Sequence, residues 1–405
     1  MKVLVLNSGS SSQKSALFDV GDQPAGNPPP PVWTATVDWQ GEVASSVVRG
    51  PDGSPVKAQS PVESRRKVIE DVLATLWSRE PRAVAGPSDI KVVGHRVVHG
   101  GPDHREPEVI TPEVKRAIER VSAFAPLHNC AELEGMEIVE KVIGPVPQVA
   151  VFDTGFHRHM PEAAAVYPGP YDWLDRGIRR YGFHGINHQY CAARAAWLLG
   201  KGLNPLRLVT CHLGNGCSLA AIRHGHSVDT TMGFTPLDGL MMGTRSGAID
   251  PGILTFLMRH DHFSGEQLDE ILNRKSGLLG ISGTSSDMRQ ILAARKAGDA
   301  RARLAFEMFV HHIQRGIGSM VASIGGLDAL IFSAGIGERS PEVRAAVCAN
   351  LGFLGLALDP EKNAAVTSDE DISQPDSTAR AFVIHAREDW AIARECRGLV
   401  AKLSA

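Results

Sequence analysis

Two arginines lie where core packing has little use for a charge. Arg96, in the segment 94–101, lies inside an expected apolar strand, and Arg245 lies in the Gly-Thr-Arg-Ser-Gly stretch 243–247. A buried arginine needs an anionic partner, which a bound substrate or a structural carboxylate could supply. A guanidinium on a glycine-rich loop can neutralise the charge on the equatorial oxygens of a phosphoryl group in transfer. A solvated surface loop is the alternative for Arg245, but the apolar residues around it favour a site.

Imidazole and carboxylate side chains occur in similar contexts. His128 and His184 are each expected in a turn, and a structural role is the alternative for each of them. Asp153 follows the apolar run 149–152, which is the usual position of a group that points into the cleft of an α/β protein.

Two similar hairpins must position these residues. The first joins the apolar runs 2–6 and 15–20 through the turn 7–14, and the second joins 208–213 and 217–222 through the turn 214–216. Turns rich in Gly and Ser expose backbone N–H groups that can bind an anion. Either turn alone could be a plain hairpin turn, but the repetition predicts a duplicated nucleotide-binding fold.

A third glycine-rich loop, 333–339, lies between the expected strand 327–332 and a helix that begins at 340–342, an order typical of phosphate sites. Periodicity and caps predict the other elements. We expect strands at 32–37, 43–48, 90–98 and 149–152, and helices at 62–77, from 111, at 188–199, 301–324 and 389–403. The proline tract 28–31 predicts a loop at the edge of the first sheet.

Length and composition limit the class of protein. The 405 residues suggest two domains, and 43% hydrophobic with 21% charged residues is typical of a globular protein. A net charge of −3 gives no basic field for nucleic acid or a membrane surface. The six cysteines have no CxxC spacing, which argues against a zinc site or a disulfide framework. Without a signal-like or membrane-spanning apolar run, we predict a cytoplasmic protein.

With these segments in view, the chain resembles the acetate kinases of the acetokinase family, within the actin, sugar kinase and Hsp70 ATPase superfamily. The resemblance covers essentially the whole length, through the motifs 7–12, 94–101, 152–154, 180–185, 212–216, 232–251 and 282–289. It implies an α/β fold of two duplicated ribonuclease H-like domains, with the active site in the cleft between the domains. The expected N-terminal domain is 1–152, completed by a C-terminal helix in 387–405, and the nucleotide-binding domain is 153–386.

The resemblance also implies reversible, Mg²⁺-dependent transfer of the γ-phosphoryl group of ATP to acetate, giving acetyl phosphate and ADP, in a homodimer. Mn²⁺ could replace Mg²⁺. The implied roles are catalysis by Asp153, His184, Arg245 and His128; substrate binding by Arg96, Val98, Leu127, Phe183 and Pro236; metal binding by Asn7 and Glu388; and nucleotide binding by Lys14, His212, Leu213, Gly214, Asn215, Gly216, Asp287, Met288, Arg289, Gly335, Ile336, Gly337, Glu338 and Arg339.

Physical chemistry refines one of these roles. Acetate is already ionised at neutral pH, so a general base would gain little, and we favour Asp153 as a residue that positions Mg²⁺ through its water shell. The small apolar pocket favours acetate over propionate. Two positions depart from the family pattern: Arg339 stands where Asn is common, and Arg387 where the family motif usually begins with Asn.

Three other functions are open to such a chain. A propionate or butyrate kinase of the same family would differ in its pocket residues. A non-catalytic nucleotide-binding module would not need Arg96, Arg245 and two histidines directed at a small acid. A sugar kinase would need a polar pocket and a true base.

Overall fold

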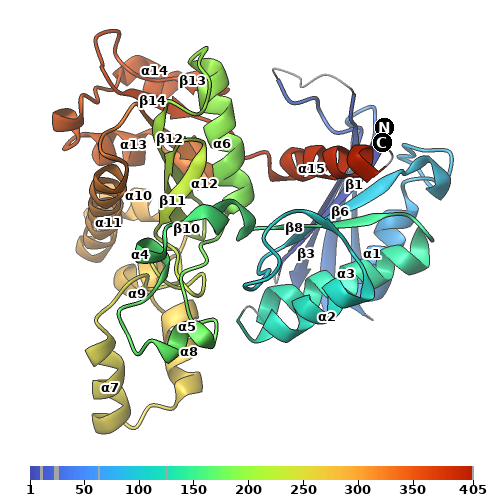
Figure 1. The fold of residues 1–405 in the computed structure, drawn as a ribbon, viewed down its shortest axis with the longest axis horizontal. Coiled ribbons are helices and arrows are strands. Elements are labelled where there is room, and N and C mark those ends of the chain that lie inside the picture. The colour runs from blue at the N-terminus through green and yellow to red at the C-terminus, as the bar shows by residue number, and fades with distance from the viewer. Residues whose placement is uncertain (10–11, 22–26, 63, 125, 404–405) are drawn as a thin grey trace. The chain divides into compact units, whose positions relative to one another are not determined.

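The computed structural model describes residues 1–9, 12–21, 27–62, 64–124 and 126–403 (Figure 1). The chain divides into two compact units: unit 1 contains Met1–Gly155 and Arg387–Ala405, and unit 2 contains Phe156–Ala386. The expected boundary placed Asp153 in the second domain, whereas here it belongs to unit 1. The reason is that its backbone N–H donates to the Val97 carbonyl at 2.8 Å. Within the described residues, none of the helices is both long and apolar enough to cross a membrane.

Unit 1 contains an eight-stranded sheet in the order β5-β4-β3-β2-β1-β6-β8-β7. Its strands are β1 (Lys2–Ser8), β2 (Ser12–Asp19), β3 (Trp33–Gln40), β4 (Val43–Arg49), β5 (Pro55–Pro61), β6 (Val92–Val97), β7 (Glu108–Val109) and β8 (Gln148–Phe152). Strands β1 to β5 form an antiparallel meander, while β6 pairs parallel with β1 and β8 parallel with β6. The proline tract 28–31 lies in a loop, as expected, and this loop connects the neighbouring strands β2 and β3.

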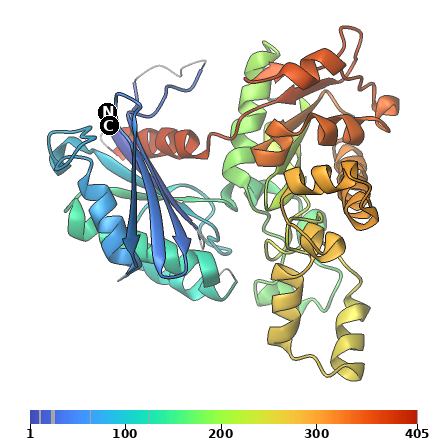
Figure 2. The ribbon, with the colours of Figure 1, turned by 180° about the vertical axis from the view of Figure 1, so that it is seen from behind.

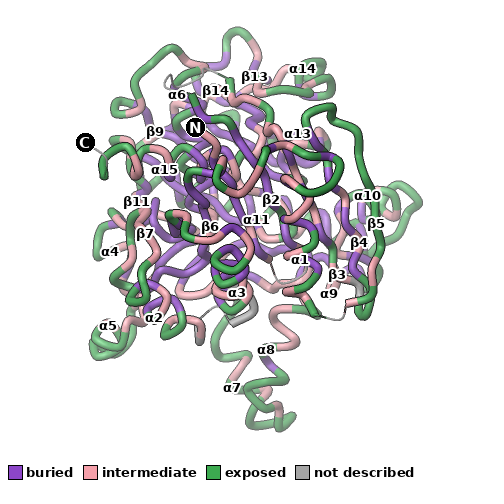
Figure 3. Tube along the Cα trace, turned by 90° about the vertical axis from the view of Figure 1, so that its right-hand side faces the viewer, coloured by how far each residue is buried: buried purple, intermediate pink, exposed green. Residues whose placement is uncertain are grey.

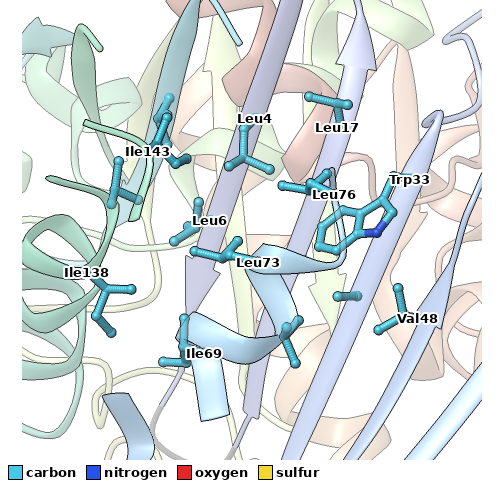
Figure 4. Packing of buried hydrophobic residues seen from close by; sticks show 14 of the residues in the cluster. Leu4, Leu6, Leu17, Trp33, Val48, Ile69, Leu73, Leu76, Ile138 and Ile143 are labelled. Atoms are coloured by element: carbon cyan, nitrogen blue, oxygen red, sulfur yellow. The ribbon is translucent and has the colours of Figure 1, made fainter. Parts of the chain in front are cut away.

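Helices cover both faces of this sheet. They are α1 (Arg65–Ala74), α2 (Pro112–Arg120), α3 (Pro126–Val142) and α15 (Glu388–Leu403), with short 3₁₀ turns at Pro87–Asp89 and Val121–Phe124. Leu4 and Leu6 of β1 pack with Leu73 of α1 and Ile138 of α3 in one buried cluster (Figure 4). On the other face the Trp390 ring of α15 lies 5.6 Å from that of Phe18.

Unit 2 repeats the pairing pattern of unit 1. Its six-stranded sheet has the order β11-β10-β9-β12-β14-β13. The strands are β9 (Arg207–Leu213), β10 (Cys217–Arg223), β11 (His226–Thr230), β12 (Ala329–Ser333), β13 (Glu370–Asp371) and β14 (Arg380–Val383). As in β3-β2-β1-β6-β8, three antiparallel strands are followed by two parallel ones. The duplicated fold predicted from the two hairpins is confirmed.

Many helices of unit 2 lie beside its sheet, whereas the two helices within residues 251–274, drawn in yellow, project away from it (Figure 2). The helices of unit 2 are α4 (Glu162–Ala165), α5 (Asp172–Asp175), α6 (Gly185–Leu198), α7 (Pro251–His260), α8 (Gly265–Arg274), α9 (Gly277–Ser282), α10 (Met288–Lys296), α11 (Ala300–Ile324), α12 (Ala334–Arg339), α13 (Pro341–Cys348) and α14 (Pro360–Ala365), with 3₁₀ turns at Gly155–His159 and Gly352–Leu354. Strands β9, β10 and β12 are largely buried and α11 is buried on one face, whereas α7 has no buried residue (Figure 3).

The loop expected at 333–339 is wrong, because α12 occupies it. A six-residue helix leaves most of its terminal carbonyls without partners in the helix. The buried guanidinium of Arg344 donates to two of them, the carbonyls of Gly337 at 2.9 Å and Glu338 at 2.8 Å. These tertiary contacts stabilise a helix that the local sequence pattern does not predict.

Candidate active site

In unit 1, β6 and the end of β8 bring Arg96 against Asp153. The Arg96 Nε atom lies 3.2 and 3.1 Å from the two carboxylate oxygens, and Nη2 lies 2.5 Å from Oδ2. The Asp153 side chain is only 1% exposed and that of Arg96 15%. Burial alone would lower the pKa of Arg96, but the carboxylates of Asp153 and Glu388 outweigh it and raise that pKa. The sequence allowed either a bound substrate or a structural carboxylate as the anionic partner of Arg96. In the structure this partner is a carboxylate, that of Asp153.

A polar chain continues from Arg96 to the start of α15. Arg96 Nη1 donates to Asn7 Oδ1 at 3.2 Å, and Asn7 Nδ2 donates to Glu388 Oε2 at 3.4 Å. Lys14, expected in a turn, is instead a residue of β2 whose backbone faces Asn7 in the ladder. Asp389 Oδ1 is buried without a hydrogen-bond partner among the described residues. Burial raises the pKa of Asp389, and the neighbouring Glu388 adds to this effect.

Glu132 is a residue of this site that the sequence did not single out. Its carboxylate is fully buried and accepts from the Val98 backbone N–H at 3.2 Å. Burial raises its pKa to about 8, although Arg96 acts in the opposite direction. No local signal marks Glu132, because α3 also carries Glu134, Glu137 and Glu140, of which the last two are exposed.

Two predicted residues of unit 1 lie on a helix rather than in a turn. Pro126 begins α3, and proline is well suited to the first position of a helix, so Leu127 and His128 belong to its first turn. Their side chains lie outside the described residues. The Val98 side chain, the third apolar residue assigned here, is buried.

In unit 2, Arg245 and His184 meet at the turn between β9 and β10. A Cβ atom built on Gly216 would lie 3.5 Å from His184 Nε2 and 3.6 Å from Arg245 Nη1. Arg245 Nη1 donates to the Pro236 carbonyl at 3.3 Å, and no carboxylate of the described residues forms an ion pair with it. Burial lowers the pKa of Arg245. A half-buried cation without a carboxylate, beside a glycine turn, is suited to bind an anion.

His184 is held from several sides. It is the residue before α6, in the left-handed region with φ 57° and ψ 22°. Its Nδ1 atom lies 2.9 Å from Ser218 Oγ, and its ring stacks on that of His212 with centroids 3.9 Å apart and planes inclined by 8°. The buried Phe183 directly precedes it, and the Phe183 carbonyl lies 3.1 Å from His157 Nε2.

Glycines fix the turn 214–216 against the segment that carries Arg245. The Gly214 N–H donates to the Gly216 carbonyl at 3.0 Å, and the Gly243 N–H donates to the Asn215 carbonyl at 3.1 Å. A Cβ atom on Gly243 would lie 2.2 Å from Asn215 Oδ1, so the backbone can approach only because residue 243 is glycine.

A cavity of about 650 Å³ opens beside this turn. Eight predicted nucleotide-binding residues line it: Gly214, Asn215, Asp287, Met288, Arg289, Gly335, Ile336 and Arg339. Ser286, Leu292, Ser340 and Glu342 also line it and were missed. Five other predicted nucleotide-binding residues of unit 2 are not in its lining: His212, Leu213, Gly216, Gly337 and Glu338. The Glu338 carboxylate instead accepts from the Ala386 N–H at 2.8 Å. The cavity is large enough for a nucleoside.

Comparison with known proteins decides the family. The model of the acetokinase family matches residues 2–394. The chain belongs to the acetokinase family. It is 55% identical over 402 residues to an acetate kinase of Cyanothece sp., and this match covers 99% of this chain and 98% of the relative. It is 56% identical to an acetate kinase of Gloeobacter violaceus, and that match covers 98% of each chain.

Solved acetokinase structures share the fold. Acetate kinase of Porphyromonas gingivalis superposes with a TM-score of 0.91 at 38% identity, covering 98% of this chain and 99% of that one. A propionate kinase of Francisella tularensis gives 0.89 at 35% identity with the same coverage. The fold is therefore common to kinases named for two different acids, and the choice of acid must depend on individual side chains.

The two departures from the acetokinase pattern lie in different places. Arg339 is exposed at the wall of the cavity, at the end of α12. Arg387 is exposed and directly precedes α15, so Glu388 keeps its position at the start of that helix.

Proposed function

We propose that the protein is an acetate kinase that transfers the γ-phosphoryl group of ATP to acetate, reversibly, giving acetyl phosphate and ADP. The observation that carries the proposal is Arg245, a half-buried cation without a carboxylate partner among the described residues, beside His184 and Gly216. Membership of the acetokinase family supports the same reaction.

Unit 2 is assigned the nucleotide and the transferred group. The cavity beside α10 and α12 takes the nucleoside of ATP, and the turn 214–216, of which Gly214 and Asn215 line this cavity, lies beside its phosphates. Arg245 and His184 donate to the equatorial oxygens of the phosphoryl group while it passes in line from ADP to acetate. They act by position and charge, since acetate attacks as an anion and needs no base.

Unit 1 is assigned the metal. Mg²⁺ binds through one or two carboxylates and keeps several waters, and here Glu388 and Asn7 offer oxygens while the buried Oδ1 atom of Asp389 lacks a partner. The described residues contain no group of three or more His, Cys, Asp or Glu that would form an all-protein metal cage, which fits this mode. When bound, Mg²⁺ would neutralise charge on the phosphate oxygens, and Mn²⁺ could do the same.

In our proposal Asp153 supports the metal site indirectly, by holding Arg96. The bidentate pair holds the guanidinium so that its Nη1 atom keeps Asn7 in place beside Glu388. In this proposal Asp153 positions the metal ligands through Arg96 and Asn7, whereas the sequence-based expectation was that it acts through the water shell of Mg²⁺. Arg96 remains the group proposed to attract the acetate anion.

Acetate is proposed as the preferred acid because the residues assigned to its methyl group are bulky. Val98 and Phe183 are buried, and Pro236 is fixed through its carbonyl by Arg245. One extra methylene in such a pocket changes selectivity by about 1–3 kcal/mol, so propionate should react more slowly rather than not at all. A propionate kinase is the second candidate, because one shares the fold.

We also propose a homodimer, as the family resemblance implies. Helix α7 has no buried residue, and its apolar side chains face outward: Ile253 is 46% exposed, Phe256 55% and Met258 50%. An apolar surface of this kind marks an interaction site, and a second copy is the proposed partner. The cytoplasmic location stays a prediction.

Trapping of acyl phosphate as hydroxamate tests the reaction. Purified protein, Mg-ATP and acetate, propionate or butyrate are compared for wild type, Arg245→Ala and the control Arg116→Ala, whose exposed side chain pairs with Glu113 on α2. We expect the signal to be strongest with acetate and to fall with chain length. Removing Arg245 should lower it by about 10³–10⁵-fold, as for other arginines that neutralise a transferred phosphoryl group.

Two results would change the assignment. A stronger signal with propionate than with acetate would favour the propionate kinase. No acyl phosphate from any acid, with ATP still bound, would favour a non-catalytic nucleotide-binding module.

A further inference from the structure

We propose that three buried side chains, Thr210, His188 and Ser218, form a hydrogen-bonded relay that keeps the proton of His184 on Nε2. His184 then presents an N–H group, and not a lone pair, at the turn where the phosphoryl group binds. The inference rests on the proposed function for its consequence, but the relay itself is a property of the protein without substrate.

The fold places these side chains on one face. His184 and His188 lie one turn apart at the start of α6, and residues four apart share a face of a helix. Thr210 and His212 are two apart on β9, so they point to the same side of the sheet, and Ser218 on β10 is the cross-strand neighbour of His212. Helix α6 therefore packs its histidines against the polar residues of the β9–β10 hairpin.

The contacts form a continuous chain. Thr210 Oγ1 lies 2.7 Å from His188 Nδ1, His188 Nε2 lies 2.8 Å from Ser218 Oγ, and Ser218 Oγ lies 2.9 Å from His184 Nδ1. Thr210, His188 and Ser218 are each at most 1% exposed. Burial lowers the pKa of His188 well below its usual range, which agrees with a neutral ring that carries a single N–H.

The direction of the relay follows from the hydroxyl hydrogen of Thr210. Among the described residues, the one hydrogen-bond partner of Thr210 Oγ1 is His188 Nδ1. If His188 donated from Nδ1, the threonine hydrogen would be buried without an acceptor, which is unfavourable because the lost hydrogen bond to water is not replaced. Thr210 therefore donates to His188 Nδ1, and His188 Nε2–H donates to Ser218.

The remaining steps are then determined. Among the described residues, Ser218 Oγ has two hydrogen-bond partners, His188 Nε2 and His184 Nδ1. Since it accepts from His188 Nε2–H, its own hydrogen has an acceptor only at His184 Nδ1, and otherwise it would be buried without one. A neutral imidazole that accepts at Nδ1 carries its proton on Nε2. The Nε2 edge of His184 is the edge that lies beside Gly216 and Arg245. A lone pair at this point would repel an anionic phosphoryl oxygen, whereas an N–H donates to it.

His212 is held in the same way by a separate residue. The Asn187 amide nitrogen lies 2.9 Å from His212 Nδ1 and 3.2 Å from Ser333 Oγ. An amide NH₂ only donates, so His212 also accepts at Nδ1 and carries its proton on Nε2. The two stacked rings, with centroids 3.9 Å apart, thus both accept a hydrogen bond at Nδ1.

Nitrogen NMR of the wild-type protein tests the relay directly. In protein labelled with ¹⁵N-histidine, two-bond correlations distinguish a protonated from an unprotonated ring nitrogen, and the His184 signals are identified by their loss in His184→Gln. We expect an unprotonated Nδ1 and a protonated Nε2 in the protein without nucleotide. A protonated Nδ1 in neutral His184 would overturn the proposal, and this result is independent of whether acetyl phosphate is formed.

Kinetics test whether the relay acts through His184. Ser218→Ala should lower kcat by about 10–100-fold, the usual cost of removing the outer partner of a functional histidine, with little change in the KM of either substrate. Ser218→Thr keeps the hydroxyl and should recover most of kcat. In a His184→Gln background, Ser218→Ala should cause no further loss. A loss of equal size in that background would show that Ser218 has only a structural role and would refute the proposal.

Discussion

Arg96 and Arg245 are both arginines of the candidate site, but their replacement should affect stability in opposite ways. Arg96→Gln removes the partner of Asp153, whose carboxylate is 1% exposed. Arg245→Gln removes a half-buried guanidinium that has no carboxylate partner among the described residues. The first variant takes the guanidinium away from a buried carboxylate, and the second removes a half-buried cation.

The magnitudes follow from burial. Leaving one member of a buried ion pair alone costs about 3–5 kcal/mol, and one kcal/mol shifts the Tm of a unit of this size by about 2–4 °C. Arg96→Gln should therefore lower the Tm of unit 1 by about 6–20 °C. Arg245→Gln should change the Tm by no more than about 2 °C, or raise it, while activity falls by about 10³–10⁵-fold.

Differential scanning calorimetry and the hydroxamate assay measure the two effects on the same samples. The double variant Arg96→Gln/Asp153→Asn is the control, because it removes both charges and should recover most of the lost stability. A Tm for Arg96→Gln equal to that of wild type would refute the argument. So would a double variant less stable than Arg96→Gln alone.

Three further outcomes follow from the structure. Burial raises the pKa of Glu132 to about 8, so its carboxyl keeps a proton in the native state that it loses near pH 4.5 in the unfolded state. The free energy of unfolding should therefore fall as pH rises from about 4.5 to 8. In Glu132→Gln the Tm should fall less over the same pH range. Because Val98 is proposed to contact the methyl group of acetate, Val98→Ala should raise kcat/KM for propionate relative to acetate by about tenfold or more, and an unchanged ratio would contradict that role. Phe256→Asp on α7 should give monomers in sedimentation velocity, whereas an unchanged dimer would place the interface elsewhere.

Local patterns were sufficient for much of the fold. The two hairpins, the capped start of α2 at Thr111 and the long helix α11 follow from turn residues, caps and periodicity, which act over a few positions. The repeated hairpin pattern also predicted the duplication, since both copies show it in consecutive residues. Several short strands were missed, among them β5, whose residues are mostly exposed and carry no clear alternation.

Many candidate site residues were found because their chemistry is visible in one short segment. Glycines next to Arg245 and the Gly-Asn-Gly turn at 214–216 are examples. Lys14 was placed in a turn because the glycine- and serine-rich run before it resembles one, but the β1–β2 ladder extends through it. Here the backbone pairing of β1 with β2 extends the strand into a segment whose composition predicted a turn.

By itself, the sequence determined which residue types occur, their turns and their periodicity, because those depend on neighbours along the chain. Tertiary structure alone decided their partners. Arg96 could have met a substrate or a carboxylate, and only the parallel pairing of β6 with β8 brings Asp153 to it across 57 positions. Ser218 reaches His184 across 34 positions, and no local pattern marks a serine in a buried strand as a proton donor. Burial then gives these contacts their strength, because water no longer competes for the same hydrogen bonds.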